Sequence, residues 1–179
     1  MNIYMILLLI FTSCSSEDPP AAKTQVLTST KHSAAKESDF DEYAFYCCNE
    51  ETLKPFFTKY LLLVQSMGDD NEQKSLRLLS ELRTESQNIN TPDGTLLAKE
   101  LSAVQSDSLS SLRESFSLFS SAVIKVIQNN KASTSNADNT IKSSVAFCPM
   151  APGRWLQDSN TIHNPYFGSE MLTCGVFEQ

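Results

Sequence analysis

The stretch 109–130 reads LSSLRESFSLFSSAVIKVIQNN, and the spacing of its apolar residues decides the predicted fold class. Large side chains recur alternately three and four positions apart, and the series consists of Leu109, Leu112, Phe116, Phe119, Val123 and Val126, ending at Asn130. This spacing places them along one side of a helix, as in the seam of a helical bundle. The stretch therefore predicts a long helix that packs on other helices.

Three further helices are predicted upstream of this seam. The first ends at Gly68 and carries an apolar stripe made by Leu53, Phe56, Phe57, Tyr60, Leu61, Val64 and Met67. The second begins at the candidate caps Asp69 and Asp70 and carries Leu76, Leu79 and Leu82. The third begins at Thr91-Pro92, with a cap followed by a first-turn proline. We therefore expect an all-α fold, an antiparallel bundle of about four helices.

The N-terminus has the pattern of an export signal. Residues 3–11 form an almost unbroken apolar run that is too short to span a bilayer and is followed by small residues. The sequence FTSC at 11–14 resembles a bacterial lipoprotein box, which predicts a signal peptide at 1–13 and a palmitate-carrying lipoprotein anchored through Cys14. Ser15 indicates the outer membrane, facing the periplasm. An ordinary signal peptide or a short membrane anchor is the alternative.

Residues 14–42 are rich in Ser, Thr, Ala, Pro and charged side chains and contain almost no large apolar residue. Such a segment buries too little apolar surface to fold alone, so we expect a flexible tether that leads to a domain at 43–179. The chain is acidic, with a net charge of −7, and contains no cluster of Lys and Arg. Because such clusters neutralise nucleic-acid phosphates, no nucleic-acid partner is expected.

The chain after the seam helix is less regular. The polar stretch 131–144 predicts a surface loop. The segment after it contains three Pro, three Gly and the only Trp of the chain. This composition predicts an irregular tail that packs on the bundle and contains at most one or two short strands.

Two pairs of sulfur side chains stand out in this tail. Cys148 and Met150 share a face if their segment is extended, and Met171 and Cys174 share one if their turn is helical. Two thiolates and two thioethers suit a soft metal ion, above all Cu(I). His163 lies in the same segment and is a further candidate ligand.

The same cysteines also suit a disulfide. If Cys14 is lipidated, four cysteines remain, an even number that allows three pairings among Cys47, Cys48, Cys148 and Cys174. Cys148 and Cys174 lie 174 − 148 = 26 positions apart. A bond between them would stabilise the domain by about 3 kcal/mol in the chain-entropy model. Met150 and Met171 would then be ordinary packing residues, and the residue pattern leaves the two interpretations open.

Four short motifs together resemble the closing signature of an uncharacterised bacterial family, the domain of unknown function numbered 3347: CPMA at 148–151, WL at 155–156, NPYFG at 164–168 and MLTCG at 171–175. Arg113, Phe116 and Ser120 resemble its Arg-x-x-Phe-x-x-x-Ser stretch. The resemblance implies a helical bundle with a sulfur-rich metal site, found in exported proteins and attached to heavy-metal efflux adaptor proteins.

These patterns together predict an exported, membrane-tethered protein that binds Cu(I) for metal handling or resistance. Its predicted partners are the membrane, through the lipid on Cys14, and a heavy-metal efflux adaptor or another envelope protein. The alternative is a disulfide-stabilised, non-catalytic interaction module of the envelope. The sequence contains no paired carboxylates, Ser/His/Asp spacing or phosphate-binding loop, so an enzyme is not predicted.

Overall fold

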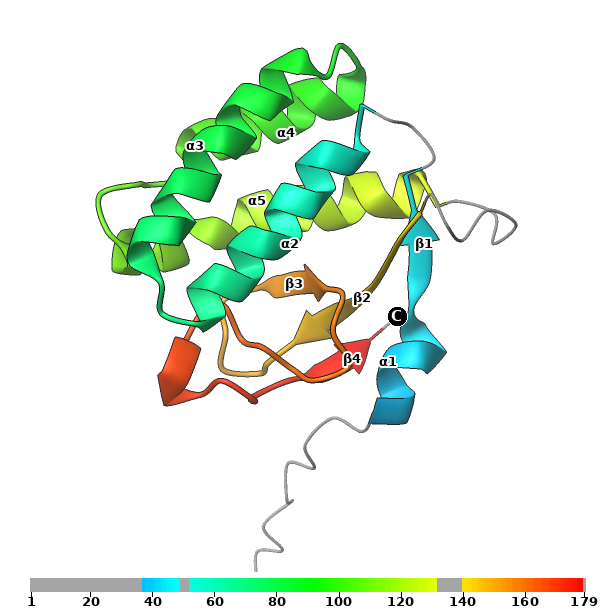
Figure 1. Cartoon of the computed structure of the whole chain (residues 1–179), viewed down its shortest axis with the longest axis vertical. Coiled ribbons are helices and arrows are strands. Elements are labelled where there is room, and N and C mark those ends of the chain that lie inside the picture. Colours follow the sequence, from blue (N-terminus) through cyan, green and yellow to red (C-terminus); the bar gives the residue numbers. More distant parts are fainter. Residues whose placement is uncertain (1–36, 49–51, 132–139, 179) are drawn as a thin grey trace, which may run out of the picture. The chain divides into compact units, whose positions relative to one another are not determined.

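The computed structural model describes residues 37–48, 52–131 and 140–178. The predicted signal peptide, Cys14 and the tether as far as residue 36 lie outside the described residues. Within them the chain forms a layer of helices and an antiparallel sheet (Figure 1). The all-α prediction is therefore wrong, and the fold is α+β. In the described part, no helix combines the length and apolar character needed to cross a membrane.

The helical layer consists of the four helices that the apolar spacing predicts: α2 (Lys54–Gly68), α3 (Glu72–Asn88), α4 (Pro92–Ala103) and α5 (Leu109–Asn129). Each packs on the next along the chain, and α5 also packs on the sheet. Their apolar faces meet in a core whose largest fully buried side chains include Phe56, Phe57, Tyr60, Phe116, Phe119 and Leu97. The periodicity thus places the core correctly, although the core continues into a sheet.

The ends of α4 and α5 follow from local side-chain chemistry. The Thr91 hydroxyl accepts a hydrogen bond from the Gly94 N–H at 3.2 Å, as predicted for the start of α4. At the start of α5, Ser108 and Ser111 form a capping box in which each side chain accepts from the other's backbone N–H. The sequence left open whether the third and fourth predicted helices run on as one. In the structure the chain breaks between α4 and α5, and this box begins a separate helix.

The turn between α2 and α3 differs from the prediction. The cap of α3 is Asn71, whose side chain accepts from the Lys74 N–H at 3.0 Å, and neither Asp69 nor Asp70 fills that role. Asp70 instead has a φ of +56°, a left-handed conformation that is uncommon for a residue other than glycine. This conformation belongs to the contact with the C-terminal segment described below.

The sheet has β2 (Ile141–Phe147) at its centre, and its other strands are β1 (Phe45–Cys47), β3 (Arg154–Gln157) and β4 (Val176–Glu178). One side of β2 pairs with β3, and the other side pairs first with β1 and then with β4. All the pairings are antiparallel. The predicted loop at 131–144 is therefore wrong at its end, where it supplies the first half of the central strand.

The short helix α1 (Glu37–Tyr43) packs on the side of the sheet away from the helical layer (Figure 1). Phe40 is buried with its ring 5.3 Å from that of Phe177 in β4, and the Ser144 hydroxyl donates to the Phe40 carbonyl at 2.9 Å. The domain core therefore includes a residue upstream of the predicted boundary at residue 43.

Side-chain hydroxyls join the outer edge of β3 to the rest of the molecule. The Leu156 N–H donates to the Tyr60 hydroxyl at 3.3 Å, and the Arg154 carbonyl accepts from Ser120 at 2.7 Å and from Tyr166 at 3.3 Å. Tyr60 and Ser120 also bond to each other at 2.6 Å. Burial raises the pKa of Tyr60 well above its usual value, which keeps this hydroxyl protonated. These bonds fix α2 and α5 on the sheet.

Candidate functional site in the C-terminal segment

The register of the sheet brings Cys148 and Cys174 together. Phe147 pairs with Val176, so the ends of β2 and β4 lie side by side, and the two cysteines flank that pair. Their Cα atoms lie 5.7 Å apart and their sulfurs form a disulfide. This separation is typical of disulfide-bonded cysteines. The structure thus joins two of the predicted ligands directly to each other.

Cys47 and Cys48 form a second disulfide between neighbours in the chain. Both residues are buried, and Cys48 has a φ of +74°. Its N–H donates to the Asn130 carbonyl at 3.4 Å, which ties the end of β1 to the end of α5. All the cysteines within the described residues are therefore paired with each other.

Met150 does not share a face with Cys148. The Ala151 N–H donates to the Cys148 carbonyl at 3.0 Å, so this segment is a tight turn rather than the extended chain that a shared face requires. Cys148 is fully buried, whereas 62% of Met150 is exposed. The extended geometry that we predicted for this pair is therefore wrong.

Met171 remains close to Cys174. The Cys174 N–H donates to the Met171 carbonyl at 2.9 Å, which closes a turn that begins at the end of the short 3₁₀ helix η2 (Gly168–Glu170). Both side chains are partly buried. One thioether therefore lies in the same turn as the disulfide, while the thioether of Met150 points to solvent.

His163 packs on the end of α2. Its ring lies so close to Gly68 that a Cβ atom at that glycine would be 2.1 Å from the imidazole Cδ2. The imidazole Nε2 lies 2.9 Å from the Asp69 carboxylate, although without the alignment of a hydrogen bond. His163 is therefore held against α2. Among the described residues, no three His, Cys, Asp or Glu side chains come together as a set of metal ligands.

Asn164 organises the turn that precedes the second cysteine. It is fully buried, and its side chain donates to the Cys174 carbonyl at 3.0 Å and accepts from the Tyr166 N–H at 2.9 Å. Its own N–H donates to the Leu172 carbonyl at 2.8 Å. Asn-Pro is typical of a turn, and the structure has one here that positions Cys174 through bonds that do not involve sulfur.

Gln157 holds the preceding loop. Its buried side-chain oxygen accepts from the Trp155 ring N–H at 3.0 Å and from the His163 N–H at 3.2 Å. Its amide nitrogen donates to the carbonyls of Ser159 and Thr161, each at 2.8 Å. Both ends of one amide are thus used to shape a loop. Sequence reasoning missed this residue because a single glutamine between Leu156 and Asp158 carries no local signal.

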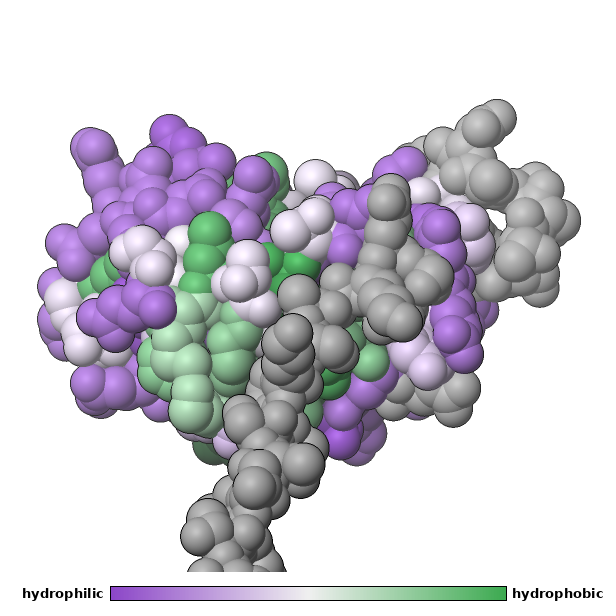
Figure 2. Space-filling model, turned by 90° about the horizontal axis from the view of Figure 1, so that it is seen from below, coloured by the Kyte–Doolittle hydropathy of each residue, from purple (hydrophilic) through white to green (hydrophobic). Residues whose placement is uncertain are grey.

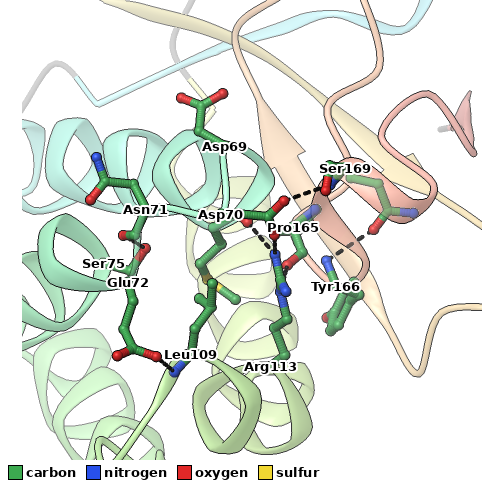
Figure 3. Close-up of polar contacts among 12 residues, drawn as sticks. Asp69, Asp70, Asn71, Glu72, Ser75, Leu109, Arg113, Pro165, Tyr166 and Ser169 are labelled. Carbon is green, nitrogen blue, oxygen red and sulfur yellow. Dashed lines mark hydrogen bonds and ion pairs between the residues drawn. The ribbon is translucent and has the colours of Figure 1, made fainter.

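Arg113 of α5 links the helical layer to the C-terminal segment (Figure 3). Its Nε donates to the Pro165 carbonyl at 2.9 Å, and its Nη2 donates to the Met67 carbonyl at 2.5 Å and to the Asp70 carboxylate at 2.6 Å. The other oxygen of Asp70 accepts from the Ser169 N–H at 2.9 Å. One charged pair therefore joins α5, the α2–α3 turn and the C-terminal segment.

Gly168 is required where these groups meet. Its φ is +54°, and a Cβ atom there would lie 2.0 Å from the Asp70 Oδ1 and 2.4 Å from the Arg113 Nη2. Glycine supplies both the left-handed backbone and the space for the ion pair. A side chain at this position would therefore displace either Asp70 or Arg113.

Acid should weaken this junction over a defined pH range. Hydrogen bonds from Ser169 and from Arg113 lower the pKa of Asp70 from 3.8 to about 2. Because the folded-state pKa is depressed, the stabilisation is present above about pH 4 and is lost as the pH falls toward 2. We expect the carboxyl carbon of Asp70 to titrate near pH 2 by NMR in the native protein. In an Arg113→Gln variant it should titrate at a higher pH, but still below its ordinary value, because the hydrogen bonds from Ser169 remain. Identical midpoints in the two proteins would contradict this assignment.

The polar groups of this segment thus hold loops in place, and its sulfur atoms lie in a disulfide and on the surface. Comparison with protein-family models, with curated proteins and with solved structures gave no match to this chain, so its resemblance to the domain of unknown function numbered 3347 stays a prediction.

Proposed function

We propose that this chain is a non-catalytic interaction module that works in an exported, oxidising compartment on a membrane tether. The link between Cys148 and Cys174 is the observation that supports the proposal best. Disulfides of this kind persist in the periplasm and outside the cell, and glutathione and thioredoxin keep them reduced in the cytosol. The predicted lipoprotein signal would deliver the chain to such a compartment.

The use of the polar side chains supports an interaction module over an enzyme. Arg113 and Asp70 tie three segments together, and Gln157 and Asn164 use both ends of their amides on backbone groups. Catalytic groups need free valences that face a substrate. These four side chains bond to backbone groups and to each other and hold the fold in place, which supports a role for the surface of the domain rather than for a catalytic centre.

Peptide mapping of the protein isolated from cell envelopes tests this proposal. Free thiols are first blocked with an alkylating agent, and the unreduced protein is then cut with trypsin. Cleavage after Lys142 and Arg154 separates Cys148, in peptide 143–154, from Cys174, in peptide 155–179. We expect these two peptides to remain joined until a reductant is added. Alkylated Cys148 and Cys174 in the unreduced sample would contradict the proposal.

Soft-metal binding by the reduced protein is a second candidate function, favoured by one observation. The pairing of β2 with β4 and the bonds of Asn164 position Cys148 and Cys174 without help from sulfur, so two thiols would stay adjacent after reduction, with Met171 in the same turn. This set of thiolates and a thioether suits Cu(I) or Ag(I). His163 is held against α2 and does not belong to the set.

The same preparation separates the two candidates. After reduction it is titrated with Ag(I), and the methyl groups of its methionines are followed by NMR. Metal binding predicts a shift of the Met171 methyl signal, whereas fully buried Met67 in α2 serves as the internal control. No shift at Met171 up to one equivalent of Ag(I) would exclude the metal candidate and leave the interaction module.

A further inference from the structure

We give the name sulfur face to five residues of the two segments that the disulfide joins, the one after Cys148 and the one that leads to Cys174: Met150, Ala151, Phe167, Met171 and Cys174. Met150 is the most exposed of them, at 62%, and the others are partly buried. Figure 2 shows the molecule from the side on which α1 and the C-terminal segment lie, and apolar residues gather there. Exposed apolar patches of this kind mark sites of interaction.

We propose that the sulfur face rests on the surface of a lipid bilayer. This inference depends on the membrane tether of the proposed function. It identifies the sulfur face as the surface of the domain that the tether brings to the membrane. The disulfide gives this face a fixed backbone, so that Met150 is presented at the tip of a rigid turn.

The place where the tether enters the domain supports this occupant. The described chain begins at α1, and α1 packs on β4 through Phe40 and Phe177, on the same side of the sheet as the C-terminal segment (Figure 1). Glu37 follows Cys14 by 37 − 14 = 23 positions. A flexible linker of that length has an average span of roughly 25 Å. The lipid on Cys14 would therefore hold this side of the domain close to the bilayer.

Because the tether is short, a small contact area is enough to keep the sulfur face on the bilayer. Linking two partners through a short flexible chain gives an effective concentration in the millimolar range. A face with only millimolar affinity for lipid is then engaged for much of the time. Few exposed apolar side chains are needed, which agrees with a face dominated by Met150.

The chemistry of the face favours an uncharged membrane surface. Methionine is unbranched and adapts to irregular apolar surroundings such as the boundary between headgroups and acyl chains. The basic groups near the segment are paired, Arg113 with Asp70 and Arg154 with Glu178, and Glu170 is exposed beside Met171. Anionic lipid would be repelled by the chain's net charge of −7, so a zwitterionic bilayer is the expected partner.

The test uses the full lipidated chain in phosphatidylcholine nanodiscs, with carbon-13 in the methionine methyl groups. A water-soluble gadolinium chelate broadens the signal of any methyl that water reaches. We expect the bilayer to reduce the broadening of Met150 at least threefold compared with the lipid-free domain, and that of Met171 in the same direction. Fully buried Met67 should be broadened little in either state. Phosphatidylglycerol should protect Met150 less than phosphatidylcholine does.

A matched probe controls for general shielding by the nanodisc. Ser80 is exposed on α3, whose main contacts are with α2, α4 and α5, so the methionine introduced by Ser80→Met should stay fully accessible with the bilayer present. A Met150→Gln variant should bind the bilayer about tenfold more weakly, because it replaces an apolar side chain by a polar one. Protection at Met171 should fall with it.

The outcomes are distinct. The mass of the N-terminal peptide reports whether Cys14 carries lipid, and an unmodified cysteine would overturn the tether and this proposal together. Lipid on Cys14 without protection of Met150 would overturn only the membrane contact and leave the interaction module. Protection that requires a second protein and does not appear with the bilayer alone would assign the sulfur face to a protein partner, and it would overturn the inference.

Discussion

Phe116→Ala is expected to lower the free energy of unfolding by about 3–5 kcal/mol, because it removes a large aromatic side chain from a fully buried position. The ring of Phe116 contacts those of Tyr60 and Phe119 in the helical layer and that of Tyr166 in the C-terminal segment, at centroid distances of 5.9, 5.9 and 5.7 Å. It therefore connects the two parts of the core. Denaturant unfolding followed by circular dichroism measures the loss.

Leu118→Ala is the matched control in the same helix. Leu118 lies two residues along α5 and is 69% exposed, so its truncation should change the free energy of unfolding by less than about 0.5 kcal/mol. A similar loss in both variants would show that the effect belongs to the helix as a whole. If only Phe116→Ala lowers the free energy of unfolding, the loss comes from the contact between the helical layer and the C-terminal segment.

Replacing both Cys148 and Cys174 by serine is expected to destabilise the domain by about 3 kcal/mol in the chain-entropy model. The bond closes a loop of 26 positions, and its removal increases the conformational freedom of the unfolded chain. The midpoint of denaturant unfolding should fall accordingly. In a reductant, which also opens the bond between Cys47 and Cys48, the midpoint of the unmodified protein should fall at least as far.

Two methionine substitutions give the control for this experiment. Met150→Leu combined with Met171→Leu keeps apolar volume and leaves the disulfide intact, so the free energy of unfolding should change by less than about 1.5 kcal/mol. If the double serine variant unfolds at the same midpoint as the native protein, the bonds of Asn164 and Arg113 alone hold the segment, and the disulfide has no stabilising role.

The four long helices were predictable because their signal is repeated many times. Each extends over 12 to 21 residues, so a stripe of apolar residues has several turns in which to appear. The cap at Thr91 was likewise a local feature, whereas the sequence did not decide whether the helices break before Ser108. The sheet was missed for the opposite reason. Strands β1 and β4 have three residues each, which is too short for any alternation to show.

The central strand also carries a misleading composition. It begins Ile-Lys-Ser-Ser after a polar stretch, and these residues predicted a loop. Ser143 and Ser144 are nevertheless fully buried in the structure. The Ser144 hydroxyl bonds to the Phe40 carbonyl, a residue 104 positions away in the sequence, so the burial of this polar group depends on a partner that no local pattern contains.

The sequence predicted which segment contains the candidate site, but it did not predict how the residues of that segment are arranged in space. The sulfur residues were visible in the sequence, which left the disulfide and the metal site as alternatives. What brings the cysteines together is the pairing of Phe147 with Val176, which follows from the sheet. The pair of Arg113 with Asp70 spans 43 positions and depends on the packing of α5 against the α2–α3 turn.

The hydroxyl groups along β3 have a consequence for how copies of this chain meet. An edge strand normally exposes a row of backbone groups that can add a strand from another molecule, which is a route to aggregation. Here the outward carbonyl of Arg154 and N–H of Leu156 are already bonded to Tyr60, Ser120 and Tyr166. These two backbone groups are therefore not available to pair with a strand from another copy of the chain.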